Sequence, residues 1–121
     1  MKLMVVDDST VMRRKISRAV EKLGDIDVIM ASNGVEALQA YEQEKPEVVT
    51  MDITMPEMDG IECVKRLKEL DKDALILIIS ALADKAATLE ALQSGAKAFI
   101  KKPFDDEQLN KELRKLLSYE S

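Results

Sequence analysis

The chain has 121 residues, a formal net charge of −5, one cysteine and no histidine, and this length fits a single domain that we expect to span residues 1–121. The acidic balance argues against nucleic acid or anionic lipid as a direct partner, and no apolar run reaches the roughly 20 residues of a membrane helix. A lone cysteine and a beginning without a signal-peptide pattern favour a cytoplasmic location, and the missing histidine removes imidazole from every mechanism on this chain.

Short apolar runs alternate along the chain with segments whose apolar residues recur at helical spacing. Capping pairs such as Asn33 with Glu36, and glycines such as Gly95, mark where the helical segments begin and end. In chain order we predict a strand at 3–6, a helix at 9–23, a strand at 28–31, a helix at 33–45, a strand at 48–51, a helix at 59–70, a strand at 75–79, a helix at 84–95, a strand at 98–100 and a helix at 105–117.

Two of these elements carry more specific expectations about packing. The five consecutive aliphatic residues at 75–79 predict a central strand that is covered on both faces. The apolar stripes of the two helices beside it predict that Leu70, Leu89 and Leu92 face the core.

Strict alternation of strands and helices predicts the fold class. Five such units imply a single doubly wound (βα)5 domain of the flavodoxin-like α/β type, with a parallel five-stranded sheet and helices on both faces. In the strand order 2-1-3-4-5, the first and third strands are neighbours, so Asp7, Asp8 and Asp52 should meet at the carboxyl edge. Ser80 and Lys102 follow two further strands and should lie at the same edge.

The expected carboxylate cluster indicates a cation. Three carboxylates at one edge would repel each other unless a positive ion lies among them. A ligand set of oxygens alone suits Mg²⁺, with Mn²⁺ as the alternative ion. A metal beside Asp52, Lys102 and Ser80 would suit phosphoryl transfer to Asp52. Alone, Asp8 is explained as a helix cap and Lys102 as a solvated lysine, so the prediction depends on their occurring together.

Four motifs, in this order, resemble those of the response-regulator receiver domains over all 121 residues. The similarity is greatest to the stand-alone chemotaxis type of receiver. The motifs are Val5-Val6-Asp7-Asp8-Ser9, the run from Met51 to Gly60, Ser80-Ala81 and Lys102-Pro103-Phe104.

The resemblance implies a role for each residue of the site. Asp52 would be the phosphoacceptor, Asp8 a direct Mg²⁺ ligand, and Asp7 a ligand acting largely through water. The backbone carbonyl of Thr54 would complete the metal ligands. Two further residues would contact the phosphoryl group: Lys102, which would neutralise one of its oxygens, and Ser80, which would donate a hydrogen bond to another. The Lys102-Pro103 peptide bond would be cis.

The resemblance also implies how the chain would signal. A histidine kinase or a phosphotransfer domain would donate to Asp52, and the chain would catalyse its own phosphorylation and dephosphorylation rather than act as an enzyme on other substrates. Ser80 would then move inward, Phe99 would rotate, and the signal would appear on the face formed by 84–95, 98–100 and 105–117. The output would be contact with another protein, with a flagellar motor switch protein as the candidate, and we expect a monomer.

Three other functions remain open at this point. The chain could serve as a phosphate sink or in a pathway other than motility. It could be an aspartyl-nucleophile phosphatase, which Asp52-Ile53-Thr54 faintly favours, although a second acid two residues after Asp52 is missing. It could also be a binding module that needs no phosphorylation, although such a module would have no need to retain the five polar residues of the site.

Overall fold

The computed structural model describes residues 1–53, 59–80 and 85–118. The elements run β1 Lys2–Val6, α1 Thr10–Val20, the short 3₁₀ helix η1 Glu21–Leu23, β2 Asp27–Ala31, α2 Gly34–Glu44, β3 Val48–Asp52, α3 Gly60–Leu70, β4 Ile76–Ser80, α4 Lys85–Gln93, β5 Ala98–Lys101 and α5 Asp106–Ser118.

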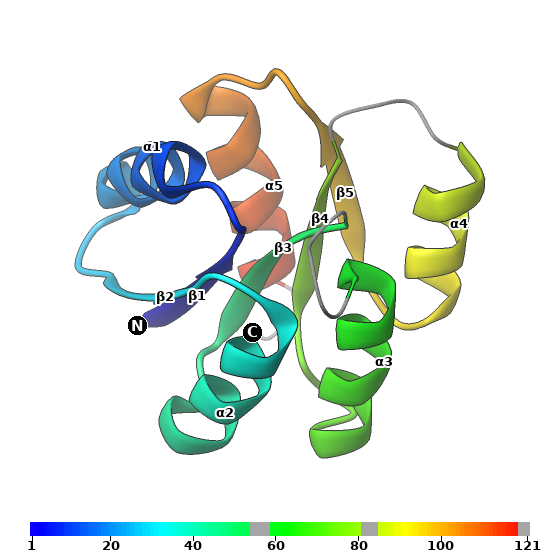
Figure 1. Cartoon of the computed structure of the whole chain (residues 1–121). Helices are drawn as coiled ribbons and strands as arrows, with labels where there is room; N and C mark the ends of the chain where they lie inside the picture. The colour runs from blue at the N-terminus through cyan, green and yellow to red at the C-terminus, as the bar shows by residue number, and fades with distance from the viewer. Residues whose placement is uncertain (54–58, 81–84, 119–121) are drawn as a thin grey trace.

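A parallel sheet with the strand order β2-β1-β3-β4-β5 forms the centre of the domain, which confirms the predicted fold (Figure 1). Helices α1 and α5 cover one face of this sheet, and α2, α3 and α4 cover the other. Each face has its own apolar core, and every residue of β4 is buried, as the run of aliphatic residues predicts. Because the strands are parallel, their carboxyl ends lie at one edge of the sheet.

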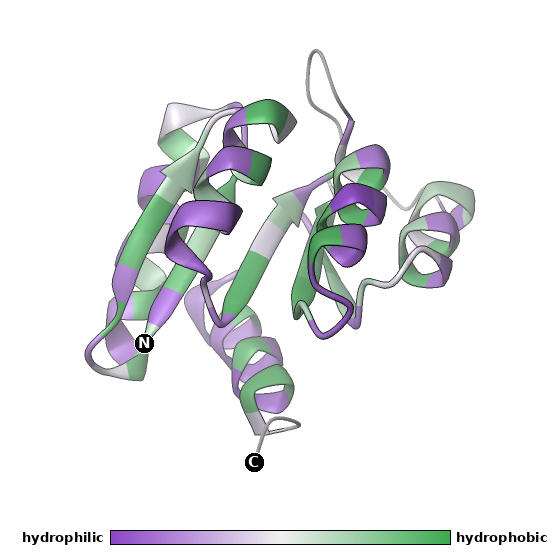
Figure 2. Cartoon of the chain, turned by 90° about the horizontal axis from the view of Figure 1, so that it is seen from below, coloured by the Kyte–Doolittle hydropathy of each residue, from purple (hydrophilic) through white to green (hydrophobic). Residues whose placement is uncertain are grey.

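Side-chain caps fix where several helices begin. The Ser9, Asn33 and Asp59 side chains each accept a hydrogen bond from a backbone N–H in the first turn of the helix that follows. Asp105 and Gln108 form a reciprocal pair before α5, with bonds of 2.8 and 3.0 Å. Figure 2 shows the hydropathy of these elements: the strands are largely apolar, whereas the helices combine apolar and polar residues.

The expectation that Leu70 and Leu89 face the core is wrong. Leu70 is 46% exposed and Leu89 is 55% exposed. In α4 the buried residues are instead Thr88 and Ala91, because the small residues of this helix take the side that meets the sheet. Leu70 is the last residue of α3, where the helix has passed the edge of the core. Among the described residues, no helix is long and apolar enough to cross a membrane.

Thr50 gives a stability prediction for the sheet. Its side chain is fully buried in β3 beside Val5 and Leu77, and among the described residues its hydroxyl has no hydrogen-bond partner. Because a buried hydroxyl without a partner is destabilising, Thr50→Val should raise the free energy of unfolding by about 1 kcal/mol in urea denaturation. Val5→Thr, which places a hydroxyl at the buried neighbouring position on β1, should lower the free energy of unfolding by about 1 to 3 kcal/mol. A loss of stability in Thr50→Val would show that the hydroxyl does have a partner.

Candidate functional site

Three carboxylates meet where β1 and β3 end. Asp52 is the last residue of β3, Asp7 directly follows β1, and pairing of Val6 with Met51 places the two strand ends side by side. Asp7 is 1% exposed and Asp52 is 6% exposed, whereas Asp8 is exposed. One carboxylate oxygen from each of the three lies within 4.8 Å of the others. Such a group of oxygens could bind a metal ion.

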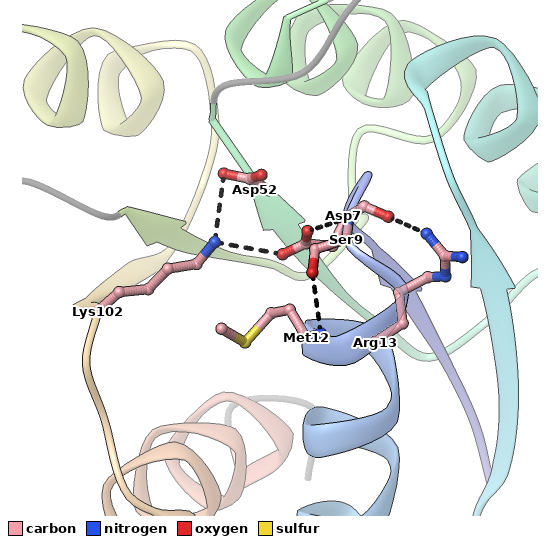
Figure 3. A network of polar contacts seen from close by, with 6 residues as sticks. All are labelled: Asp7, Ser9, Met12, Arg13, Asp52 and Lys102. Atoms are coloured by element: carbon pink, nitrogen blue, oxygen red, sulfur yellow. Dashed lines mark hydrogen bonds and ion pairs between the residues drawn. The ribbon is translucent and has the colours of Figure 1, made fainter.

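Lys102 brings a positive charge to this cluster from the segment after β5 (Figure 3). Its Nζ lies 3.3 Å from Oδ2 of Asp7 and 3.9 Å from Oδ1 of Asp52. Its side chain is 19% exposed, so the ion pairs are only weakly screened by water. Its backbone N–H donates to the carbonyl of Ser80 at 2.6 Å, and the peptide bond to Pro103 is cis. The Lys102 ammonium is therefore a positive charge, supplied by the protein, beside the two buried carboxylates.

The loop that carries Asp7 is held by the first turn of α1. Oδ1 of Asp7 accepts a hydrogen bond from the backbone N–H of Ser9 at 2.8 Å, and Oγ of Ser9 accepts one from Met12 at 3.2 Å. Arg13 donates from Nη1 to the backbone carbonyl of Asp7 at 2.6 Å (Figure 3). Arg13 was not identified from the sequence, because a lysine or arginine on the first turn of a helix is usually solvated. The partner of Arg13 is moreover a backbone atom, which no side-chain pattern indicates.

Gly60 lies against the backbone at the end of β3. Its N–H donates to the carbonyl of Ile53 at 2.6 Å, and a Cβ at this position would clash with the backbone oxygen of Asp52. Only glycine fits such a close backbone approach. From the sequence, Gly60 was identified only as part of a loop and a motif, since no pattern reveals this contact.

The other predicted residues lie at different distances from the cluster. Ser80 ends β4, next to the strand that ends at Asp52, and is 6% exposed. Thr54 lies outside the described residues, so the structure does not describe its carbonyl. Phe99 lies on β5, is 40% exposed, and lines a groove of about 280 Å³. Among the described residues, the others that line this groove are Lys85, Thr88, Leu89, Leu92 and Lys101.

Comparisons with known proteins agree with this geometry. A family model described as the response regulator receiver domain matches residues 3–114. The chemotaxis protein CheY of Bacillus subtilis is 40% identical over 117 residues, covering 97% of this chain and 98% of the relative. The crystal structure of the CheX-CheY-BeF3-Mg+2 complex from Borrelia burgdorferi matches with a TM-score of 0.90 at 33% identity, over 97% of this chain and 89% of that one. Chemotaxis protein CheY4 of Vibrio cholerae matches with a TM-score of 0.89 at 31% identity, over 95% and 97% of the two chains.

Cys63 should be chemically inert, because it is buried in α3. Burial raises the pKa of its thiol to about 12, so hardly any thiolate forms at neutral pH. At pH 8 the native protein should react with a thiol-specific disulfide reagent at least about a hundredfold more slowly than the urea-unfolded chain. Equal reaction rates in the native and the unfolded protein would show that the thiol is accessible and that its pKa is not raised by burial.

Proposed function

The chain belongs to the response-regulator receiver domains, and from this we propose that it is a phosphorelay protein whose Asp52 accepts a phosphoryl group from a histidine kinase or a phosphotransfer domain. The observation that carries the proposal is the cluster of Asp7, Asp8 and Asp52 with the Lys102 ammonium beside Asp7 and Asp52. A buried carboxylate, further acids and a lysine at one sheet edge are the groups that phosphoryl transfer to an acid needs.

The donor set of the cluster fits a hard cation. All the side-chain ligands are carboxylate oxygens, which favours Mg²⁺, with Mn²⁺ as the alternative. We propose that Asp8 and Asp52 bind the ion directly and Asp7 largely through water, and that the backbone carbonyl of Thr54 completes the protein ligands. When bound, Mg²⁺ would neutralise charge on the donor and acceptor oxygens.

Several residues of the site then have a defined task in the proposed transfer. A carboxylate oxygen of Asp52 attacks the phosphorus of the donor, so that an O–P bond forms while the N–P bond to the donor histidine breaks. The Lys102 ammonium, 3.9 Å from Asp52, balances negative charge on the transferred group. Arg13 and Ser9 keep Asp7 in place through bonds of 2.6 and 2.8 Å. The protein thus assists its own modification and is not an enzyme for other substrates.

The route from the site to an output surface follows β4 and β5. We propose that a phosphoryl group on Asp52 draws the Ser80 hydroxyl inward and that Phe99 then rotates toward the space this leaves. Ser80 pairs with Lys101 and Ile78 pairs with Phe99, so the two strands are in direct register. Inverting a population from 1:99 to 99:1 takes about 5.5 kcal/mol, which a few charge-assisted hydrogen bonds in a partly dry site can supply.

The proposed output is protein contact at the surface of α4, β5 and α5. In support, Phe99 and Leu89 are exposed there and border the 280 Å³ groove. Similarity to CheY proteins over nearly the whole chain favours a role in chemotaxis. We propose that the chain acts as a monomeric, cytoplasmic messenger and that its candidate partner is a flagellar motor switch protein. Binding of a purified switch protein to the phosphorylated form alone would support this output. A phosphorylated form that does not bind would favour a phosphate sink or a pathway other than motility.

Asp52→Asn tests the acceptor. An amide is not a nucleophile toward phosphorus, so treatment with a small acyl phosphate and Mg²⁺ should add a phosphoryl group to the wild type and none to the variant, as measured by intact mass. Asp59→Asn is a matched control, because Asp59 is exposed and an asparagine can still cap α3. Circular dichroism should show all three proteins folded. Modification of Asp52→Asn at the wild-type rate would refute the assignment.

Asp8→Asn tests the metal. Removal of one full negative charge from the ligand set should weaken Mg²⁺ binding about tenfold or more in isothermal titration calorimetry. Because Asp8 is exposed, the fold should not change. Asp27→Asn removes an equal charge from the exposed start of β2, at the opposite edge of the sheet, and should leave Mg²⁺ affinity as in the wild type. Equal affinity in Asp8→Asn and the wild type would show that Asp8 is not a ligand.

A further inference from the structure

Lys15 of α1 contacts the segment that follows Lys102. Its Nζ donates to the backbone carbonyl of Phe104 at 2.9 Å, and the same ammonium lies 4.6 Å from the centroid of the Phe104 ring. Phe104 is 5% exposed and belongs to the core between the sheet and the helices α1 and α5. One lysine side chain thus binds both the backbone and the ring of a buried residue that lies 89 positions further along the chain.

The segment from Lys102 to Phe104 has an anchor at each end. At one end the N–H of Lys102 donates to the carbonyl of Ser80 at 2.6 Å. At the other end the carbonyl of Phe104 accepts the bond from Lys15. The Lys102 ammonium reaches Asp7 and Asp52 from between these anchors. A shift of either anchor would therefore move the lysine relative to the carboxylates.

Helix α1 contacts both the loop that carries Asp7 and the segment that carries Lys102. Its first turn holds Asp7 through Ser9 and Arg13, and its next turn carries Lys15. The same rigid element therefore holds the loop with the carboxylate and the segment with the lysine. This shared support would keep the distance between Asp7 and Lys102 constant.

We propose that Lys15 is a positioning residue for Lys102: its bond to Phe104 keeps the Lys102 ammonium above Asp7 and Asp52. The inference rests on the proposed function, because the positioned lysine assists phosphoryl transfer to Asp52. Small misplacements of a charged group near reacting atoms are costly, but Lys15 is exposed and its contacts are partly screened. Loss of its ammonium should therefore slow phosphorylation by about three- to tenfold.

Lys15→Met tests the proposal, because methionine retains an unbranched apolar stem and removes the charge. The measured quantity is the initial rate of phosphorylation by a small acyl phosphate at saturating Mg²⁺, followed by intact mass. Arg14→Met is the matched control, since Arg14 is an exposed neighbour on α1 with no hydrogen bond or ion pair to the described parts of the chain. The control should phosphorylate at the wild-type rate. A wild-type rate in Lys15→Met would overturn the proposal.

A double-mutant cycle separates positioning from general stabilisation. If Lys15 acts through Lys102, then Lys15→Met should cause no further loss of rate once Lys102→Met is present. An equal loss in both backgrounds would show that Lys15 acts through some other part of the molecule, and it would overturn the proposal.

Amide hydrogen exchange tests the same contact without any phosphoryl donor. The Lys102 amide is protected by its hydrogen bond to the carbonyl of Ser80. Its hydrogen should exchange several-fold faster in Lys15→Met than in the wild type, and at the wild-type rate in Arg14→Met. Unchanged exchange in both variants would overturn the proposal. A wild type that exchanges as expected but accepts no phosphoryl group would instead refute the proposed function and leave the contact between Lys15 and Phe104 established.

Discussion

The ion pairs from Lys102 to Asp7 and Asp52 are the interactions on which the site depends. Two almost fully buried carboxylates at adjacent strand ends would repel each other strongly in this poorly solvated environment. The ammonium at 3.3 and 3.9 Å offsets part of that repulsion. It does so only because strands paired in parallel bring residues 7, 52 and 102 to one edge. The order of the strands therefore determines the electrostatics of the site.

The contacts around the ion pairs are mostly to backbone atoms. Arg13 binds the carbonyl of Asp7, Lys15 that of Phe104, and Gly60 lies against that of Asp52. Contacts of this kind fix where the chain runs, and thereby where the carboxylates and the lysine of the site lie. Such fixed charges are consistent with the proposed mechanism, in which positioned charge supplies most of the catalysis.

The strands, their order and the meeting of Asp7, Asp8 and Asp52 were predicted correctly from the sequence. Hydrophobic period indicates the strands, and the doubly wound order 2-1-3-4-5 places the carboxyl ends of the first and third strands side by side. The prediction failed at Leu89, where a small-residue face of α4 packs on the sheet in place of the leucine. Arg13 and Lys15 gave no signal, since a basic residue on a helix looks solvated until its distant backbone partner is known. Their roles depend on three-dimensional distances that no local pattern encodes.

The separation of 95 positions between Asp7 and Lys102 has a consequence for synthesis on the ribosome. The chain emerges from its N-terminus, so the three acids are exposed to solvent long before the lysine that balances them has been translated. Until β5 and α5 dock, the nascent chain has the Asp52 carboxylate but not the cation beside it. Competence to receive a phosphoryl group, as proposed above, would thus arise only after β5 and α5 have been translated and docked, which would keep shorter nascent chains from consuming the donor.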